Sequence, residues 1–177
     1  MKLLAQTFIT LLFITAPRAQ AELVAHWPLD GNAKDLLGNH DGEESGVIFG
    51  VEGAANHTGT AAEFNGSSST ITVPFDSVMN PESFTLSMWV NADSTNGFAS
   101  PVTSRDDTPT SVHGYLIYND NSGNWNFWTG TGGPSGAWNQ MSGGKVEIGS
   151  WTHIAVSFDD NSQTKKLYIN GSLAGSN

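Results

Sequence analysis

The residues best suited to ligand chemistry gather between positions 115 and 138, where aromatic and amide side chains are mixed with glycine and serine. Aromatic rings pack against the apolar face of a sugar ring, and a few polar groups set among them bond its hydroxyls. By residue type, this segment predicts a carbohydrate site. Its candidate ligand residues are Tyr115, Tyr118, Asn119, Asp120, Trp125, Asn126, Trp128 and Trp138.

The alternative is that most of these rings are core or loop-fixing residues. Successive side chains of a strand point to opposite faces. Trp125 and Phe127 therefore share one face of the predicted strand, while Asn126 and Trp128 share the other. One of these pairs is expected to face the core. His153 belongs to a regular strand, and a structural hydrogen bond is the expected role for its ring.

A second group of candidate ligands is acidic. Asp30, Asp35 and Asp41 lie in a polar loop that runs to Gly42. Calcium takes oxygen ligands from carboxylates and from backbone carbonyls. A structural calcium ion is therefore a possible cofactor, although the spacing is not that of an EF-hand. Asp30 and Asp35 alternatively do no more than cap turns.

Catalysis is not expected. A retaining glycosidase needs two carboxylates about 5–5.5 Å apart. Glu43 and Glu44 are adjacent and would point to opposite faces of a strand. The chain has no cysteine nucleophile, and no Gly-x-Ser-x-Gly sequence is present. The residues therefore predict a binding module and not an enzyme.

Residues 1–21 have the pattern of a secretory signal peptide. A lysine at position 2 precedes an apolar run, and Ala19-Gln20-Ala21 matches the small-residue cleavage pattern. An uncleaved N-terminal membrane anchor is the alternative. The pattern predicts a secreted protein, extracellular or periplasmic, whose domain spans residues 22–177 and does not insert into a membrane after cleavage.

The charge of the chain narrows the class of partner. Without Lys2 and Arg18, 5 basic residues face 17 acidic ones, a formal charge of −12. Phosphate contacts require lysine and arginine, so nucleic acid is not an expected partner. Carbohydrate or a glycoprotein surface remains compatible with this charge.

Short alternating or β-branched runs, separated by Gly, Asn, Asp and Ser, predict an all-β fold. We expect an antiparallel β-sandwich of the jelly-roll type. The Asn-Gly at positions 170–171 predicts a type I′ hairpin. The expected strands are Leu23–Trp27, Val47–Val51, Ala61–Phe64, Thr70–Val73, Phe84–Val90, Phe98–Ser104, Gly114–Tyr118, Trp125–Trp128, Trp151–Phe158 and Lys166–Ile169.

Five segments in this order resemble one family. They are His26–Ala33, Ala62–Gly66, Phe84–Val90, Gly149–Ala155 and Leu167–Gly171. Together they look like the laminin-G-like domain of the concanavalin A-like lectin/glucanase superfamily, in its bacterial secreted form. The resemblance covers the chain from Leu23 to its end. It implies a concanavalin A-like jelly roll.

The resemblance also carries functional expectations. It implies a non-catalytic recognition module, most simply one that binds carbohydrate or glycoconjugate. A protein–protein adhesion or spacer module is the alternative, and a glycoside hydrolase-like enzyme is a distant third. Family members continue beyond the Asn170-Gly171 hairpin, so we expect the domain to lack its closing C-terminal strands. The carboxylate that completes a family calcium site would lie in those strands.

Overall fold

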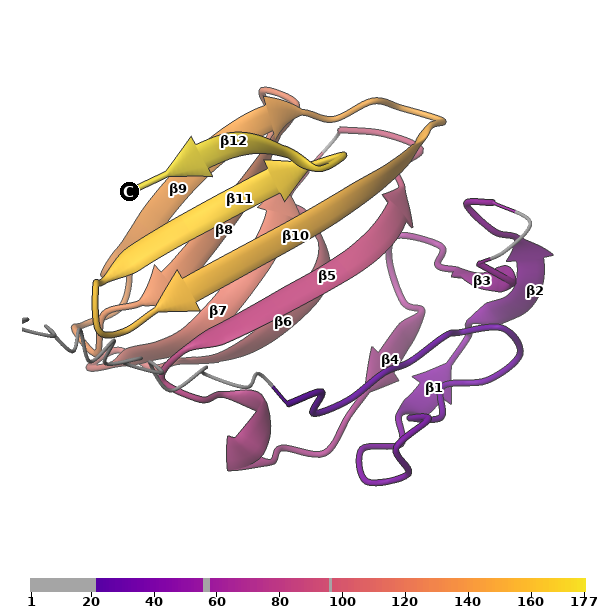
Figure 1. The fold of residues 1–177 in the computed structure, drawn as a ribbon, viewed down its shortest axis with the longest axis horizontal. Helices are drawn as coiled ribbons and strands as arrows, with labels where there is room; N and C mark the ends of the chain where they lie inside the picture. The colour runs from indigo at the N-terminus through magenta and orange to yellow at the C-terminus, as the bar shows by residue number, and fades with distance from the viewer. Residues whose placement is uncertain (1–21, 56–57, 96) are drawn as a thin grey trace, which may run out of the picture.

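The computed structural model describes residues 22–55, 58–95 and 97–177, so the predicted signal peptide lies outside the described residues. The described chain is an antiparallel all-β fold, as predicted (Figure 1). Its elements are β1 (Glu43–Ser45), β2 (Ile48–Glu52), β3 (Thr60–Glu63), β4 (Thr70–Thr72), the 3-10 turn η1 (Ser77–Met79), β5 (Phe84–Asn91), β6 (Ala99–Asp107), β7 (Val112–Asn119), β8 (Asn124–Gly130), β9 (Trp138–Lys145), β10 (Trp151–Asp159), β11 (Thr164–Ile169) and β12 (Ser172–Ser176).

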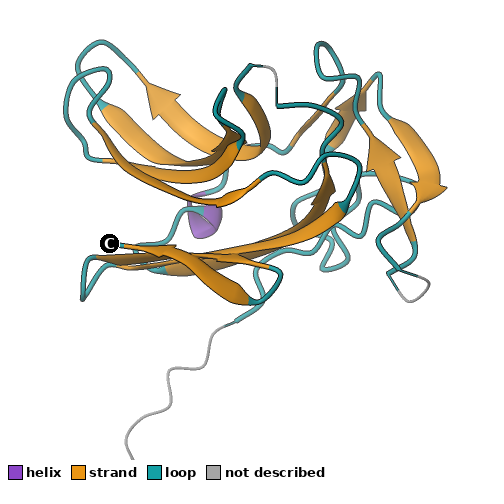
Figure 2. Ribbon diagram, turned by 90° about the horizontal axis from the view of Figure 1, so that it is seen from above, coloured by secondary structure: helices purple, strands orange, loops and turns teal. Residues whose placement is uncertain are grey.

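Two four-stranded sheets stack to form an open sandwich (Figure 2). We call the sheet with order β6-β7-β8-β9 the front sheet, and the sheet with order β12-β11-β10-β5 the back sheet. Two short strand pairs, β1 with β4 and β2 with β3, lie to one side of the sandwich (Figure 1). They leave the outer faces of both large sheets uncovered.

The core follows from strand alternation. On β10, Ile154 and Val156 are fully buried, whereas the alternate residues His153, Ala155 and Ser157 are only partly buried. On β8, Trp125 and Phe127 belong to the same core cluster. Alternating side chains point to opposite faces of a sheet, so each strand contributes every second residue to the space between the sheets. The inward residues of β5 pack against this cluster and stay partly exposed.

The two sheets approach closely at one side through glycine. A Cβ on Gly143 of β9 would lie 2.4 Å from the carbonyl oxygen of Ala174 in β12. A Cβ on Gly144 would lie 2.7 Å from the Ile169 side chain. These glycines allow β12 to pack against β9, which brings the front and back sheets together there. On the other side β5 and β6 are edge strands, so the sandwich is open.

The Asn-Gly hairpin prediction is confirmed. β11 pairs antiparallel with β12, and the turn residues Asn170 and Gly171 have φ angles of 49° and 79°. Positive φ at both central residues is the property of a type I′ turn. The turn matches the twist of the flanking strands and so fixes the path of β12.

Three parts of the strand prediction are wrong. Residues Leu23–Trp27 form no strand, because the backbone N–H of His26 donates to the Asp35 carboxylate and the His26 carbonyl accepts from Leu36. The prediction also missed β1 and β9. The glycine-rich sequence of β9 indicates a loop. In the structure its backbone pairs with β8, and its glycines leave room for β12 to pack closely against it.

A lysine lies inside the sandwich. Lys165 of β11 is fully buried, its Nζ donates to the carbonyl oxygen of Asn139 at 2.6 Å, and it lies 5.5 Å from the centre of the Phe127 ring. Burial lowers the pKa of the Lys165 amine to about 8. Removing an ammonium group from water without a carboxylate partner is costly, so the neutral amine fits this position better.

Replacing Gly143 with alanine tests the close approach of β9 and β12. The new methyl group would overlap the Ala174 backbone, and we expect the free energy of unfolding to fall by about 1–3 kcal/mol. Gly31→Ala is the control, because nothing lies within 4 Å of its Cβ position. Chemical denaturation measures both variants. Equal stability of the two would contradict the packing described.

Lys165 predicts a rise of stability with pH. Its pKa is about 8 in the folded chain and 10.5 without burial. Between these values the unfolded chain binds more protons, so the free energy of unfolding increases as pH rises. We expect denaturation midpoints to climb from pH 7 toward pH 9.5. Lys165→Met should flatten this slope and stabilise the fold at pH 7 by on the order of 1 kcal/mol. An unchanged slope in that variant would refute the assignment.

Candidate functional site

The outer face of the front sheet carries a group of aromatic and polar side chains. In Figure 2 this sheet bends away from the back sheet, and no other strand or helix of the described chain lies over it. Leu116, Tyr118 and Asn126 point to this face and are still buried, with at most 7% of their surface exposed. The low exposure of these residues on an uncovered face shows that the side chains of the face pack against one another.

Two aromatic rings meet in the centre of this face. Tyr118 of β7 and Trp128 of β8 are in edge-to-face contact, with ring centroids 5.0 Å apart and planes at 89°. Edge-to-face pairs of this kind are favourable beyond their burial. The β7–β8 register produces the contact, because Tyr118 is opposite Asn126 and Leu116 is opposite Trp128. Tyr118 therefore holds the orientation of the more exposed Trp128 ring.

A fixed carboxylate lies beside the rings. Asp120 opens the β7–β8 turn, and its oxygens accept hydrogen bonds from the side chains of Asn126 at 3.0 Å and Asn124 at 3.3 Å and from the backbone N–H of Ser122 at 2.9 Å. The Asn126 hydrogen bond and the others lower the pKa of Asp120, against the opposing effect of burial. Burial and the Asp120 charge raise the pKa of Tyr118 to about 12. At neutral pH the face therefore presents a carboxylate acceptor next to a phenol.

Two residues of this face were missed in the sequence. Phe98 is 69% exposed and its ring centroid lies 5.6 Å from that of Tyr118. Gln140 of β9 is exposed and directly opposite Trp128. Phe98 is a large apolar residue directly after a polar loop, which is a signal for an exposed ring. The predicted strand Phe98–Ser104 begins with this residue and so assigns it a structural place. Gln140 lay in a segment interpreted as loop.

The structure separates the eight predicted ligand residues into two groups. Tyr115 and Trp125 belong to the core cluster, and Asn119 is 2% exposed on the same inward side. Alternation turns Tyr115 and Trp125 into the sandwich, so Trp125 and Phe127 are the pair of β8 that faces the core. The other five lie on the outer face or at its turn: Tyr118, Asp120, Asn126, Trp128 and Trp138. For these five, ligand binding stays a prediction.

Asp35 uses its carboxylate to hold its own loop. Its oxygens accept from the backbone N–H groups of His26 at 2.8 Å, Leu37 at 3.1 Å, Asn39 at 3.3 Å and His40 at 3.2 Å. Burial raises the pKa of Asp35, but these four hydrogen bonds outweigh it and bring the pKa to about 2. A carboxylate with this set of donors acts as an anion bound by backbone amides.

The other two candidate calcium ligands are also engaged locally. Asp30 accepts from the backbone N–H of Thr60, and Asp41 accepts from the backbone N–H of Asp35 and faces Lys34 at 3.6 Å. Among the described residues, no three His, Cys, Asp or Glu side chains come close enough to hold a metal ion. Calcium binding by Asp30, Asp35 and Asp41 stays a prediction, and no part of the proposed function depends on it.

One serine–histidine pair consists of residue types that occur together in catalytic sites. The Ser111 hydroxyl lies 2.5 Å from His113 Nε2 at an exposed position. A serine nucleophile needs a base that a third group orients. The ion pairs formed by the described residues do not include His113. This geometry gives no support to catalysis.

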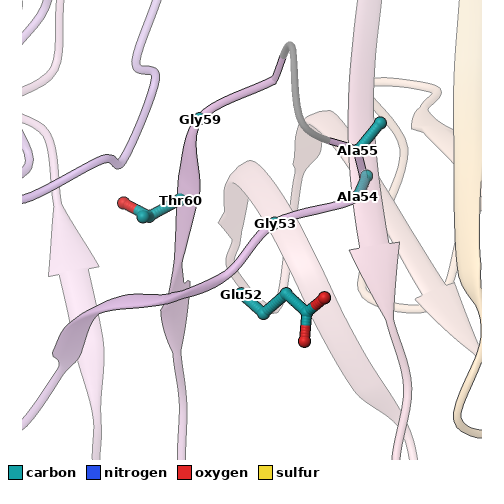
Figure 3. Close-up of a pocket in the computed structure, with 6 residues that line it drawn as sticks. All are labelled: Glu52, Gly53, Ala54, Ala55, Gly59 and Thr60. Carbon is teal, nitrogen blue, oxygen red and sulfur yellow. The ribbon is translucent and has the colours of Figure 1, made fainter.

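A hollow lies in the β2–β3 hairpin (Figure 3). Its lining consists of Glu52, Gly53, Ala54, Ala55, Gly59 and Thr60. The Glu52 and Thr60 side chains point away from one another (Figure 3). This lining lacks aromatic residues and convergent polar groups, so the hollow is a poor match for a small-molecule site.

Comparison with known proteins identifies the fold. A family model described as the concanavalin A-like lectin/glucanases superfamily, of the laminin G type, matches residues 65–177. No curated protein matches the sequence. In the part of the chain that the structure describes, no helix is long and apolar enough to cross a membrane.

Acid titration tests the role of Asp35. Its pKa is lowered from 3.8 to about 2 in the folded chain, so its contribution to stability is complete above pH 3.8 and is lost as pH falls toward 2. We expect Asp35→Asn to lower the melting temperature at pH 7 and to reduce the loss on acidification. Calcium and a chelator should leave the melting temperature of the unmodified chain unchanged. A clear rise with calcium would show that a metal binds.

Proposed function

The chain belongs to the concanavalin A-like lectin/glucanase superfamily, and on that basis we propose that the outer face of its front sheet binds a neutral carbohydrate without cleaving it. Fold alone does not decide function in a superfamily that contains both binding proteins and enzymes. The side chains of this face are what distinguishes binding from catalysis.

The observation that carries the proposal is the ring pair beside a fixed carboxylate. Trp128, held by Tyr118, and the exposed Phe98 supply apolar surface of the kind that packs on a sugar ring. Asp120 supplies an acceptor for sugar hydroxyls, and its orientation is set by Asn124 and Asn126 before any ligand arrives. Preorganisation of this kind lowers the cost of binding. Tyr118 and Asn126 are buried, so they position the contacting groups.

The proposal of binding without hydrolysis rests on the carboxylates of this face. Hydrolysis of a glycosidic bond needs a second carboxyl group as acid, base or nucleophile. Asp120 is a carboxylate of the β7–β8 turn, and the outward neighbours of its ring pair are uncharged: Asn126, Gln140 and Trp138. The hydrogen bonds from Asn126, Asn124 and Ser122 lower the pKa of Asp120 against the effect of burial and keep it ionised, whereas a general acid must hold a proton near neutral pH.

We further propose that the protein acts outside the cytoplasm. The support is the signal-peptide pattern of residues 1–21 and the acidic composition of the remainder. A protein–protein adhesion or spacer role is the competing function. It is favoured if the front face recognises no sugar.

A glycan array followed by titration tests the carbohydrate proposal. The full chain should bind at least one neutral glycan, and Phe98→Ala should weaken that binding about tenfold, as expected for the loss of one ring contact. Phe75→Ala is the matched control, because Phe75 is 79% exposed and has no place in the ring group. Isothermal titration gives both affinities.

Two outcomes would contradict the proposal. Binding to no glycan on a broad array would refute carbohydrate recognition. Equal weakening by Phe98→Ala and Phe75→Ala would place the site elsewhere. Reducing-sugar release from polysaccharides that bind should stay at background, and any release that depends on Asp120 would show that the face is catalytic.

A further inference from the structure

The outer face of the back sheet carries exposed aromatic side chains. Figure 1 looks onto this broad face, and no other described element covers it. Trp89 of β5 is 47% exposed and packs on His153 of β10, with ring centroids 5.1 Å apart. Trp151 is two residues from His153 on the same face, and Tyr168 of β11 lies opposite Ala155. The face thus exposes a group of aromatic rings around small side chains.

This face is nearly free of charge in a strongly acidic chain. The outward residues of β5 are Thr85, Ser87, Trp89 and Asn91, all uncharged. The charged side chains of the face are Asp159 and Lys166 at one end, and the Lys166 charge lowers the pKa of Asp159 as a minor cause after the Ser162 hydrogen bond. The chain has 17 acidic residues, so this exclusion of carboxylates marks a surface that a second acidic molecule can approach.

The size of the face suits a weak contact between two identical molecules. Its strands β5, β10, β11 and β12 have 8, 9, 6 and 5 residues. At about 3.3 Å per residue and about 4.8 Å between strands, they cover roughly 450 Å². Two such faces in contact would bury about 900 Å², which is in the range of weak protein–protein contacts. Exposed tryptophan and tyrosine side chains are the residue types that contribute most to such interfaces.

We propose that the outer face of the back sheet is the contact surface of a symmetric homodimer. Because a two-fold interface uses the same patch on both molecules, that patch must not repel itself. The face meets this condition, because it is uncharged apart from Asp159 and Lys166 at one end, although the chain has a net charge of −10. In the dimer, Trp89, Trp151 and Tyr168 are buried against the partner copy. The two front sheets then face outward on opposite sides, and each molecule keeps its proposed sugar site free.

Analytical ultracentrifugation of the full chain tests the dimer directly. Across about a hundredfold range of concentration, the mass should rise from near 18.8 kDa toward twice that value. Added salt should favour the dimer, because it screens the repulsion between the two acidic molecules.

Two serine variants locate the interface. Ser87 and Ser142 are exposed strand residues on the outer faces of the back and front sheets, respectively. Ser87→Glu places a carboxylate opposite Ala155 and two residues from Trp89, within the proposed interface, and should weaken dimerisation at least about tenfold. Ser142→Glu makes the same chemical change elsewhere and should leave dimerisation unchanged.

Specific results would overturn the inference. A monomer at every concentration and salt level would refute the dimer, and would leave this face free for another partner such as a polysaccharide. A dimer that resists Ser87→Glu as well as Ser142→Glu would place the interface on another surface. Glycan binding by the front sheet is measured separately, so the failure of either proposal is recognised independently of the other.

Discussion

The register between β7 and β8 is the constraint on which the rest of the molecule depends. It places Tyr118 opposite Asn126 and Leu116 opposite Trp128, and it sends Trp125 and Phe127 into the core. The side-chain period of a strand is two, so a slip of one residue would exchange these two sets. The Asp120 turn fixes the register, because its carboxylate accepts from the N–H of both Ser122 and Asn124.

The same carboxylate therefore has two structural consequences. It fixes the turn that sets the register, and it lies beside the rings that the register exposes. The core and the proposed site are consequently not independent. Trp125 and Phe127 stabilise the sandwich from inside, while Asn126 and Trp128 of the same strand form its outer surface. The back sheet uses alternation in the same way, with Ile154 and Val156 inside and His153 and Ala155 outside.

Much of this organisation could be predicted from local pattern. Alternation correctly predicted strands at Phe84–Val90 and Trp151–Phe158, and Asn170-Gly171 predicted its turn. Contacts between distant segments could not be predicted. Strand β9 could not be predicted, because Gly143 and Gly144 are poor strand formers by residue type. Their small size is needed because β12 packs closely against them. Alternation separated Trp125 from Trp128, but only the packing of the two sheets shows which of them faces the core. Residue type also does not show that backbone N–H groups donate to the Asp35 carboxylate, because only the folded loop brings these groups together.

The central claim is that the β7–β8 register places Trp128 on the outer face, where it contacts the ligand, and Trp125 in the core. An NMR spectrum of the ¹⁵N-labelled tryptophan indoles, recorded during titration with a glycan that binds, tests it most directly. The account predicts that the Trp128 indole signal shifts as the glycan is added and that the Trp125 signal stays in place. A shift of Trp125 with Trp128 unmoved would contradict both the register and the proposed site.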